Sequence, residues 1–253
     1  MPGFTVTIVT LNESANIAEA LESVTFADEI ILVDAHSTDD TVALARRFTD
    51  RVIVRDWPGY IAQKNFAAAQ ASHDWILSLD ADERVTPALA AEIRARLASD
   101  PPHSGYRIPR LSHYLGAWVR WTDWYPDYQL RLYDRRRGQW EGRYVHESVQ
   151  VKGEVGRLNS DLLHYTYRDV SHHLQTIDRY TSLAARQMFE DGRRAGVRHL
   201  LLNPVAAFLR NYIARGGFRG GRVGLIVSLL NSYYVLLKFV KLWELHQGTQ
   251  SKG

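Results

Sequence analysis

The chain has 253 residues, of which 45% are hydrophobic, 11% aromatic and 23% charged, and it contains no cysteine. This composition supports a buried core and excludes wholesale disorder, a disulfide scaffold and any site built on a thiolate. Residues 1–100 hold 16 acidic and 8 basic residues, whereas residues 101–253 hold 12 acidic and 23 basic ones. The basic part suits a nucleic acid, an anionic lipid or a phosphorylated substrate. The first residues lack a basic and then apolar leader pattern, so we expect no cleaved secretory signal.

Strand-like apolar runs alternate with helical spacing through the first hundred residues. Strands are predicted at Val6–Leu11, Glu29–Asp34, Arg51–Arg55 and Trp75–Asp80, and helices at Ile17–Val24, Thr38–Phe48, Ile61–Ala71 and Pro87–Leu97. This alternation predicts an α/β fold with a mostly parallel sheet flanked by helices. Ligands of such sheets bind at the carboxyl ends of the strands.

Beyond residue 100 the pattern changes twice. Aromatic-rich strands and loops are expected from Pro101 to about Tyr167, and helical spacing returns from Val170. Two apolar segments follow, Leu200–Ile213 and Val223–Trp243, joined by a loose glycine- and arginine-rich run. We therefore divide the chain into residues 1–100, 101–170 and a helical C-terminal extension at 171–253.

Acidic side chains follow three of the predicted strands. Glu13 follows the first, Asp34 ends the second, and Asp80 ends the fourth, with Asp82 close behind. Carboxylates gathered at one sheet edge repel each other unless a cation lies between them, and oxygen ligands favour Mg²⁺ or Mn²⁺. The alternative is a solvated acidic turn, but the buried strand before Asp80 and the acids on neighbouring strands favour a metal site.

Four motifs in order resemble the inverting nucleotide-sugar glycosyltransferases of family 2, which have the GT-A fold. They are TIVTLNE, VDAHSTDDT, the pair Lys64-Asn65 and LSLDADE. Further along, RLYDRR, WEGRYVHE and LLHYTYRD resemble the branch that adds glucose to heptose in the inner core of bacterial lipopolysaccharide. The resemblance implies a nucleotide-sugar-binding half at residues 1–100 and an acceptor-side, catalytic half at 101–170. The partners that it implies are a UDP-sugar and a lipopolysaccharide core acceptor.

The resemblance also implies a donor site. Asp34 would accept a hydrogen bond from uracil, Lys64 would lie near the diphosphate, and Arg131 would clamp phosphate. The alternatives are helix capping for Asn12, Ser14, Ser37, Thr38 and Asp39, and an exposed surface position for Lys64 and Arg131. The full donor-binding set is Thr10, Asn12, Glu13, Asp34, Ser37, Lys64, Asp80, Ala81 and Arg131.

The reaction needs a cation for the departing diphosphate and a base for the acceptor hydroxyl. We assign the metal to Asp82 and Asp80 with His164 as a third ligand, although His146 competes for that role and either histidine could be a core residue. Glu147 is our choice for the base. Asp127 and Asp123 are held in reserve, and an ion pair with one of Arg135–Arg137 is the structural alternative for Glu147. Arg143 is a further candidate phosphate clamp.

Two other segments carry functional expectations. Tyr114, Trp118, Trp121, Trp124 and Tyr125 are assigned to the acceptor side, since aromatic faces stack on sugar rings, with core packing as the alternative. From residue 186 onward 11 basic residues face 3 acidic ones. The apolar run Leu225–Leu237 is shorter than a membrane span needs, so an amphipathic helix pair lying in an anionic membrane surface is expected. Ordinary packing helices or a dimer interface are the alternative.

These observations predict a cytoplasmic enzyme attached peripherally to the inner membrane face. A family 2 transferase acting on polyprenyl phosphate or another surface glycan needs the same donor chemistry and stays open. A sugar nucleotidyltransferase is less favoured, because TLNES stands where a glycine-rich basic loop would follow the first strand. A nucleic-acid binder is not favoured, because the sequence contains no recognition motif for one.

Overall fold

The computed structural model describes residues 3–98, 101–142 and 147–250. Four strands of the first hundred residues form a parallel block, β1 (Phe4–Thr10), β2 (Glu29–Asp34), β3 (Val52–Val54) and β4 (Trp75–Asp80), in the order β3-β2-β1-β4. All seven residues of β1 are buried, as expected of a strand covered on both faces. The carboxyl ends of β1, β2 and β4 coincide, because Thr10 pairs with Asp34 and Val9 with Asp80.

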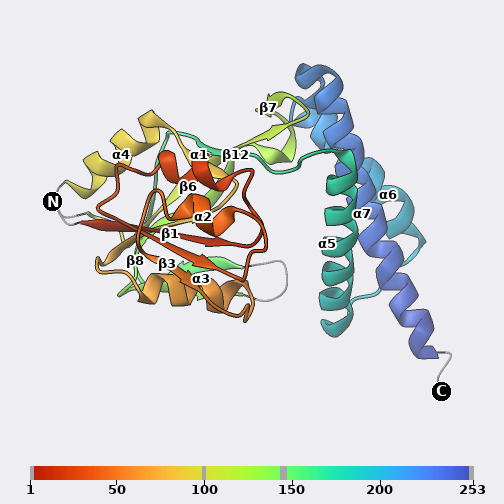
Figure 1. The fold of residues 1–253 in the computed structure, drawn as a ribbon. Helices are drawn as coiled ribbons and strands as arrows, with labels where there is room; N and C mark the ends of the chain where they lie inside the picture. The colour runs from red at the N-terminus through yellow and green to blue at the C-terminus, as the bar shows by residue number, and fades with distance from the viewer. Residues whose placement is uncertain (1–2, 99–100, 143–146, 251–253) are drawn as a thin grey trace. The chain divides into compact units, whose positions relative to one another are not determined.

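Helices cover the two faces of this block (Figure 1). On one face, α1 (Ile17–Glu22), α2 (Thr41–Ala45) and α4 (Pro87–Leu97) pack through a core that includes Leu21, Ala45 and Ile93. On the other face, α3 (Tyr60–Ala69) packs through Ala67 and Ala68. Helix α4 begins where the sequence predicts, because the Thr86 hydroxyl accepts the Leu89 N–H and Pro87 occupies the first turn.

The middle of the chain extends the sheet beyond β4. Strands β8 (Asp127–Asp134) and β6 (Gly105–Tyr114) pair antiparallel, and β12 (Leu162–His164) pairs antiparallel with β5 (Glu83–Val85), while β11 (Val155–Arg157) pairs with β6. A separate hairpin of β9 (Gly138–Glu141) and β10 (Ser148–Val151) packs on the α3 face through Trp140 and Val149. Residues 3–98, 101–111, 127–142 and 147–165 thus form one compact unit, the sheet unit.

The second compact unit, the helical unit, comprises residues 112–126 and 166–250. It contains β7 (Ala117–Val119), the short turn η1 (Thr122–Trp124) and the helices α5 (Val170–Glu190), α6 (Val197–Leu209) and α7 (Gly221–Gln250). The turns η2 (Arg210–Ala214) and η3 (Gly217–Gly220) connect α6 to α7. A Cβ added to Gly224 would lie 1.9 Å from the carbonyl oxygen of Gly217, so this close approach requires glycine.

Helix α7 corrects one sequence-based expectation. The interruptions at Asn231 and Ser232 do not end the helix, and the segment Gly217–Gln247 is long and apolar enough to cross a membrane by length and composition. The expectation that this segment is too short to span a membrane was therefore wrong. Only 22% of its most apolar stretch is buried, so α7 also differs from the core helix of a globular protein, which is mostly buried.

Candidate active site

The loops after β1 and β2 are tied together at the carboxyl edge of the sheet. The Asp34 carboxylate is buried and accepts the Ser37 N–H at 2.7 Å and the Ser37 hydroxyl. The Ser37 hydroxyl in turn accepts the Asn12 N–H at 2.8 Å, and the Asn12 side-chain oxygen accepts the Thr38 N–H at 2.8 Å. Asn12 has a positive φ of 55°, which asparagine tolerates better than most residues. Three predicted donor residues, Asn12, Asp34 and Ser37, therefore form one hydrogen-bonded group.

A second set of hydrogen bonds connects the same two loops. The Glu13 N–H donates to the Thr41 hydroxyl at 2.8 Å, and the Ser14 N–H donates to Asp39. The Thr41 hydroxyl hydrogen bond is the largest cause that lowers the pKa of Asp39, to about 2. Neither Asn12 nor Ser14 caps α1, whose N-cap residue is Asn16. The polar side chains of these motifs thus cross-link two loops, and Asp39 also accepts the Thr41 N–H at the start of α2, at 3.0 Å.

Asp80, at the end of β4, lies between two cations. Lys64 Nζ donates to Oδ1 at 2.7 Å, and the Arg131 guanidinium donates to Oδ2 at 2.5 Å. Burial alone would raise the pKa of Asp80, but Arg131 and then Lys64 hold it well below its usual value. The alternative of a surface position for Lys64 and Arg131 was wrong, because both are buried, at 6% and 3% exposure. Their direct contact with the donor diphosphate stays a prediction.

Glu83 was not singled out from the sequence, yet it organises this cluster. It is fully buried and accepts from Arg131 at 2.7 Å, from Arg110 at 3.4 Å and from the Asp80 N–H at 3.0 Å. The ring of Trp140 lies 4.1 Å from Lys64 Nζ and 5.7 Å from the Arg131 guanidinium carbon, measured to the ring centroid. Two cations, Lys64 and Arg131, contact Asp80, and the carboxylate of Glu83 supplies the second negative charge that neutralises them.

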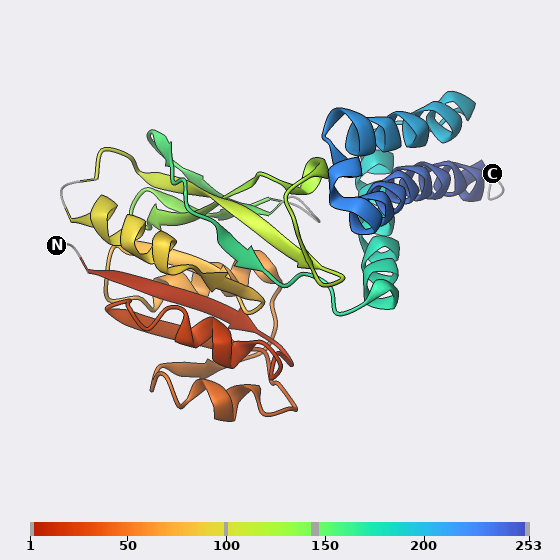
Figure 2. The ribbon, with the colours of Figure 1, turned by 90° about the horizontal axis from the view of Figure 1, so that it is seen from above.

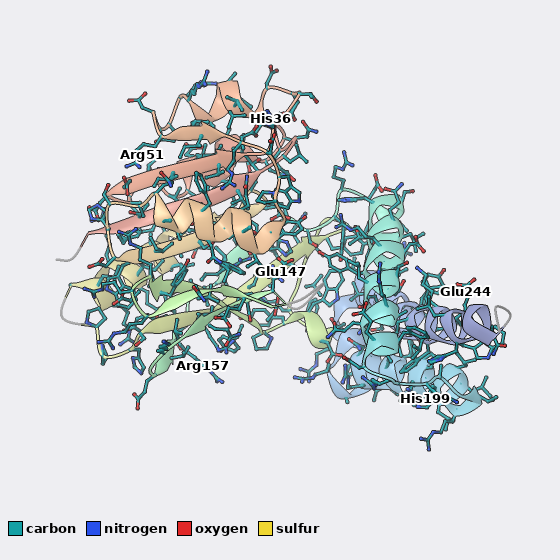
Figure 3. The ribbon with its side chains drawn as sticks, turned by 90° about the horizontal axis from the view of Figure 1, so that it is seen from below. His36, Arg51, Glu147, Arg157, His199 and Glu244 are labelled. Carbon is teal, nitrogen blue, oxygen red and sulfur yellow. The ribbon has the colours of Figure 1, made fainter. Side chains whose placement is uncertain are left out.

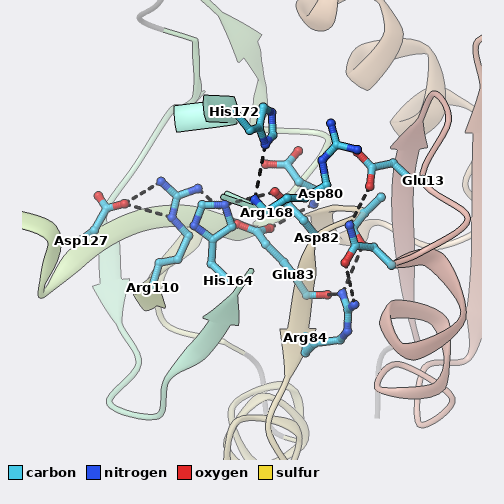
Figure 4. A network of polar contacts seen from close by, with 12 residues as sticks. Glu13, Asp80, Asp82, Glu83, Arg84, Arg110, Asp127, His164, Arg168 and His172 are labelled. Carbon is cyan, nitrogen blue, oxygen red and sulfur yellow. Dashed lines mark hydrogen bonds and ion pairs between the residues drawn. The ribbon is translucent and has the colours of Figure 1, made fainter. Parts of the chain in front are cut away.

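Asp82 and His164 are the pair best placed to hold a divalent ion (Figure 4). Asp82 Oδ2 lies 3.3 Å from His164 Nε2, and the Tyr165 N–H donates to the Asp82 carbonyl oxygen, which fixes β12 beside the motif. Within the described ranges, no cluster of three or more His, Asp or Glu side chains is suited to a metal. Two protein ligands fit Mg²⁺ or Mn²⁺ when phosphate oxygens and water complete the coordination. Because Asp80 is engaged by Lys64 and Arg131, its role would be indirect. His146, the competing ligand, lies outside the described residues, as does Arg143.

Glu147 is carried by the β9–β10 hairpin, immediately before Ser148, which pairs with Glu141 (Figure 3). Burial raises the pKa of Glu147, the positive charge of Lys64 opposes this rise, and the negative charge of Asp80 adds to it. The carboxylate is thus within electrostatic range of the predicted donor site. A raised pKa suits a general base, because it means that the carboxylate of Glu147 has a higher affinity for a proton.

The structural alternative for Glu147 was an ion pair with Arg135, Arg136 or Arg137. Arg136 instead pairs with Asp134 and Asp74, while Arg135 donates to the Ala68 carbonyl oxygen and Arg137 to Ser104. All three therefore bond elsewhere.

The two reserve carboxylates are also engaged. Asp127 pairs with Arg110 at 2.6 Å inside the sheet unit. Asp123 belongs to the helical unit, where it pairs with Arg210 and Arg215 and accepts from Asn211. Asp123 thus links η1 to η2. Arginine side chains therefore contact both reserve carboxylates.

Two further residues position the site: Arg84, which no motif singled out, and Asn65, which belongs to the Lys64-Asn65 motif. Arg84 donates to the Ala81 carbonyl oxygen and to Asn16, which joins the acidic motif to α1. Asn65 of α3 clamps the backbone of Trp140, accepting its N–H and donating to its carbonyl oxygen, both at 2.9 Å. The clamp connects the helix that carries Lys64 with the hairpin that carries Glu147. Thr10 Oγ1 is buried and has no hydrogen-bond partner in the part of the chain that the structure describes.

Core packing accounts for part of the aromatic stretch. Tyr114 is buried in the helical unit, and Trp124 packs beside it with a ring separation of 5.5 Å. Trp124 also lines a cavity of about 290 Å³ together with Tyr167, Tyr180 and Tyr234. The acceptor-side assignment of these residues stays a prediction.

Comparison with known proteins decides the family. The family model described as glycosyl transferase family 2 matches residues 5–150, more than half of the chain. The chain belongs to family 2 of the glycosyltransferases. It is an enzyme that depends on a nucleotide sugar, and the enzyme class and the family predicted from its motifs are both confirmed.

This family 2 enzyme has relatives along nearly its full length. It is 32% identical to the lipopolysaccharide core biosynthesis glycosyltransferase LpsC of Rhizobium meliloti (strain 1021), over 94% of this chain and 91% of that protein. It is 30% identical to an uncharacterized glycosyltransferase of Rickettsia prowazekii (strain Madrid E), over 96% and 88% of the two chains.

Two solved structures share the fold of this enzyme. A mannosyltransferase from Pyrobaculum calidifontis, in complex with GDP-mannose and Mn²⁺, superposes with a TM-score of 0.56 at 15% identity and covers 96% of this chain and 88% of that one. Glucosyl-3-phosphoglycerate synthase from Mycobacterium tuberculosis, with Mn²⁺, UDP-glucose and phosphoglyceric acid, gives 0.52 at 17% identity, over 77% and 82%. The GT-A fold is confirmed.

Proposed function

We propose that this enzyme transfers a hexose, glucose by resemblance, from a UDP-sugar to a heptose of the lipopolysaccharide inner core with inversion. The full-length similarity to a lipopolysaccharide core glycosyltransferase supports the acceptor class. The position of Asp34 and the inner-core motifs support the donor and the sugar. The observation that carries the proposal is that Lys64 pairs with Asp80 at the carboxyl end of β4, and that the charges of both act on Glu147, whose pKa is raised.

The donor half of the reaction follows from the buried charges. Asp34 can accept a further hydrogen bond from uracil, because a carboxylate has more acceptor positions than the two that Ser37 occupies. Lys64 and Arg131, held by Asp80, place positive charge beside the path of the departing diphosphate. A divalent ion held by Asp82 and His164 would act as a Lewis acid for that leaving group.

The acceptor half requires removal of a proton. Glu147 would accept it from the attacking hydroxyl as the new glycosidic bond forms and the bond to the diphosphate breaks. Inversion requires attack from the face opposite the leaving group, and holding both substrates in line contributes several kcal/mol, about 7–11 at most.

We further propose that the enzyme works in the cytoplasm, attached peripherally to the inner membrane face. A lipid-borne acceptor supports this location, as do the basic residues that flank α6 and α7. No nucleic acid takes part in the proposed reaction.

The test is a transfer assay with purified protein. UDP-glucose, UDP-galactose and GDP-mannose are offered with Mn²⁺ to lipopolysaccharide truncated at the inner-core heptose, and to polyprenyl phosphate in parallel. We expect UDP-glucose to be consumed with the truncated core and the product to have the inverted linkage. Transfer only to polyprenyl phosphate would show that the proposed acceptor is wrong. Use of GDP-mannose alone would show that the proposed donor is wrong.

A further inference from the structure

The helical unit exposes a large apolar surface on one side of α7. Helix α6 presents Leu201, Leu202 and Val205 at 63%, 65% and 57% exposure, continued by Val197, Leu209 and Ile213. Helix α7 presents Leu225, Leu229, Tyr233, Val240 and Trp243, all at least 38% exposed. An apolar face of this extent on a helix pair indicates an interaction surface.

The two apolar faces adjoin each other. Helices α6 and α7 run side by side (Figure 2). The Ser232 hydroxyl of α7 donates to the Pro204 carbonyl oxygen of α6, and Phe239 packs against His199. Each of these α7 residues immediately precedes an exposed one, Tyr233 or Val240. The exposed stripe of α7 therefore borders α6, and we call the combined surface the α6–α7 face.

The opposite side of α7 is covered by α5. Lys241 donates to Asp178 at 2.6 Å and to Ser182, and Leu242 is buried near Ala185 and Met188. The outer surface of α5 is polar, with Asp178, Arg179, Arg186 and Glu190 exposed. If α7 crossed a bilayer, these charges would lie in the hydrocarbon, where they are costly. The packing of α5 therefore opposes a transmembrane orientation, although α7 has sufficient length.

The charge around the α6–α7 face identifies its partner. Residues 192–243 contain nine lysine and arginine residues and no acidic residue. Arg198 and Arg222 are exposed at the starts of α6 and α7. Each lies three residues before an exposed leucine of the face, Leu201 or Leu225, and therefore on the same side of its helix. A basic rim around an apolar face complements an anionic lipid surface, whereas a second copy of this chain would bring the same positive charges together.

We propose that the α6–α7 face inserts into the headgroup region of an anionic membrane, with α6 and α7 lying in the membrane plane and α5 facing water. This inference rests on the proposed function, because membrane binding would bring the enzyme to a lipid-borne acceptor. Lipid binding can be measured without sugar transfer, so that failure of one proposal leaves the other standing.

The first experiment measures binding of the full chain to vesicles. Wild type should float with vesicles of phosphatidylglycerol and phosphatidylethanolamine. The double substitution Leu201→Gln with Val205→Gln should weaken partition roughly tenfold or more. The matched control is Val170→Gln with Leu174→Gln, the same spacing on α5, which should bind as wild type does. Equal loss in both double variants, or in neither, would overturn the assignment of the face.

The basic rim has its own test. Arg198→Gln with Arg222→Gln should weaken binding to phosphatidylglycerol vesicles about fivefold per residue at low salt, with little change on phosphatidylcholine. Light scattering tests the alternative of a dimer interface. The proposal fails if the wild type self-associates, the Leu201→Gln/Val205→Gln variant is monomeric, and neither protein binds lipid.

Orientation can be read because the chain has no cysteine. A polarity-sensitive probe is attached to Leu225→Cys, Tyr233→Cys or Trp243→Cys, and its depth is measured with lipid-borne quenchers. Similar shallow depths at the three sites support an in-plane helix. A central site much deeper than the two ends would show a spanning α7 and overturn the proposal. The full chain is used because removal of residues after Asp191 would expose the buried face of α5.

Discussion

The sheet unit and the helical unit manage charge and apolar surface in opposite ways. In the sheet unit, cations are brought into the interior and paired, as Arg131 is with Asp80 and Glu83. In the helical unit, most arginines lie at the surface, while large side chains such as Leu201 and Leu202 remain exposed. Buried pairs cost desolvation and are retained where charge must be held in place. Exposed apolar surface is retained where a partner covers it. The two proposals therefore assign the chemistry to the sheet unit and the membrane attachment to the helical unit.

The largest effect should follow loss of the second aspartate of the acidic motif. Asp82→Ala should lower kcat about a thousandfold, on the order of 4 kcal/mol, because the diphosphate would depart without its stabilising cation. The control is Asp74→Ala, immediately before the amino end of β4, where an exposed ion pair with Arg136 contributes at most about 1 kcal/mol. EDTA should reproduce the Asp82 defect in wild type. Near-normal turnover of the variant would remove Asp82 from the mechanism.

Loss of the proposed base, Glu147, should lower kcat slightly less than loss of Asp82, and it should also change the pH dependence of kcat. Glu147→Gln should lower kcat on the order of a hundredfold to a thousandfold without a change in melting temperature. Because burial raises the pKa of Glu147, the base is lost as pH falls through that raised pKa. The acid limb of the wild-type kcat profile should therefore lie above the ordinary glutamate value of 4.5 and be absent from the variant's residual activity. An unchanged acid limb would assign the base elsewhere.

Removal of Arg131 from its charge cluster with Asp80 and Glu83 should destabilise the sheet unit. Arg131→Met should cost about 3–5 kcal/mol of unfolding free energy, because it leaves the fully buried Glu83 and the partly buried Asp80 with one fewer cation. Adding Glu83→Leu should restore part of that loss, since the unpaired charge is removed. Urea denaturation measures both. A double variant as unstable as the sum of its parts would show that Glu83 and Arg131 do not act as a pair.

The two units should respond to acid in different pH windows. Burial lowers the pKa of His173 to about 4, and its Nδ1 lies 3.0 Å from the Tyr114 hydroxyl. Below its ordinary pKa of 6.5 the unfolded chain takes up a proton that the folded unit refuses, so stability falls with pH until about 4. The loss near pH 5 should be about 2 kcal/mol. By contrast, the pKa of Asp80 is lowered, so its contribution persists down to pH 3.8 and is lost only below that.

Hydrogen exchange can separate these windows. At a pH near 5, after correction for intrinsic rates, α5 should lose protection relative to neutral pH, while β1 and β4 keep theirs. His173→Gln should reduce the pH dependence in α5. Parallel loss in both units would show that one cooperative transition controls them.

The smallest effect concerns the tie between the first two loops. Ser37→Ala removes the hydroxyl that connects Asp34 with Asn12 and should cost about 1 kcal/mol of stability. Because the loops border the predicted nucleoside site, KM for the donor should rise while kcat changes little. A lower kcat at unchanged KM would contradict a role in donor binding.

Local patterns were sufficient for the sheet unit's main elements. The predicted bounds of β2, β4 and α4 agree with the structure, because continuous apolar runs and the Thr86 cap act within a few residues. Helix α2 was predicted over Thr38–Phe48 but occupies only Thr41–Ala45, because Thr38 donates its N–H to Asn12 across the loops. Such cross-loop competition has no signal in the local sequence.

The charge pairs and the long helix were beyond local reasoning for a similar reason. Lys64 and Arg131 are 16 and 51 residues from Asp80, and nothing in their own segments predicts that they share its carboxylate. In α7, Ser228 and Ser232 donate to the carbonyl oxygens of Gly224 and Pro204, so polar residues that interrupt the apolar run are satisfied without ending the helix.

The clamp between Asn65 and Trp140 has a consequence for how such an enzyme can diversify. It fixes the first strand of the β9–β10 hairpin to α3, while Glu147 stands at the start of the second strand. We therefore expect the nucleotide half to tolerate changes in the sequence that links the two strands. We expect that exchanging this connection among relatives would change which hydroxyl is glycosylated while leaving the choice of donor intact.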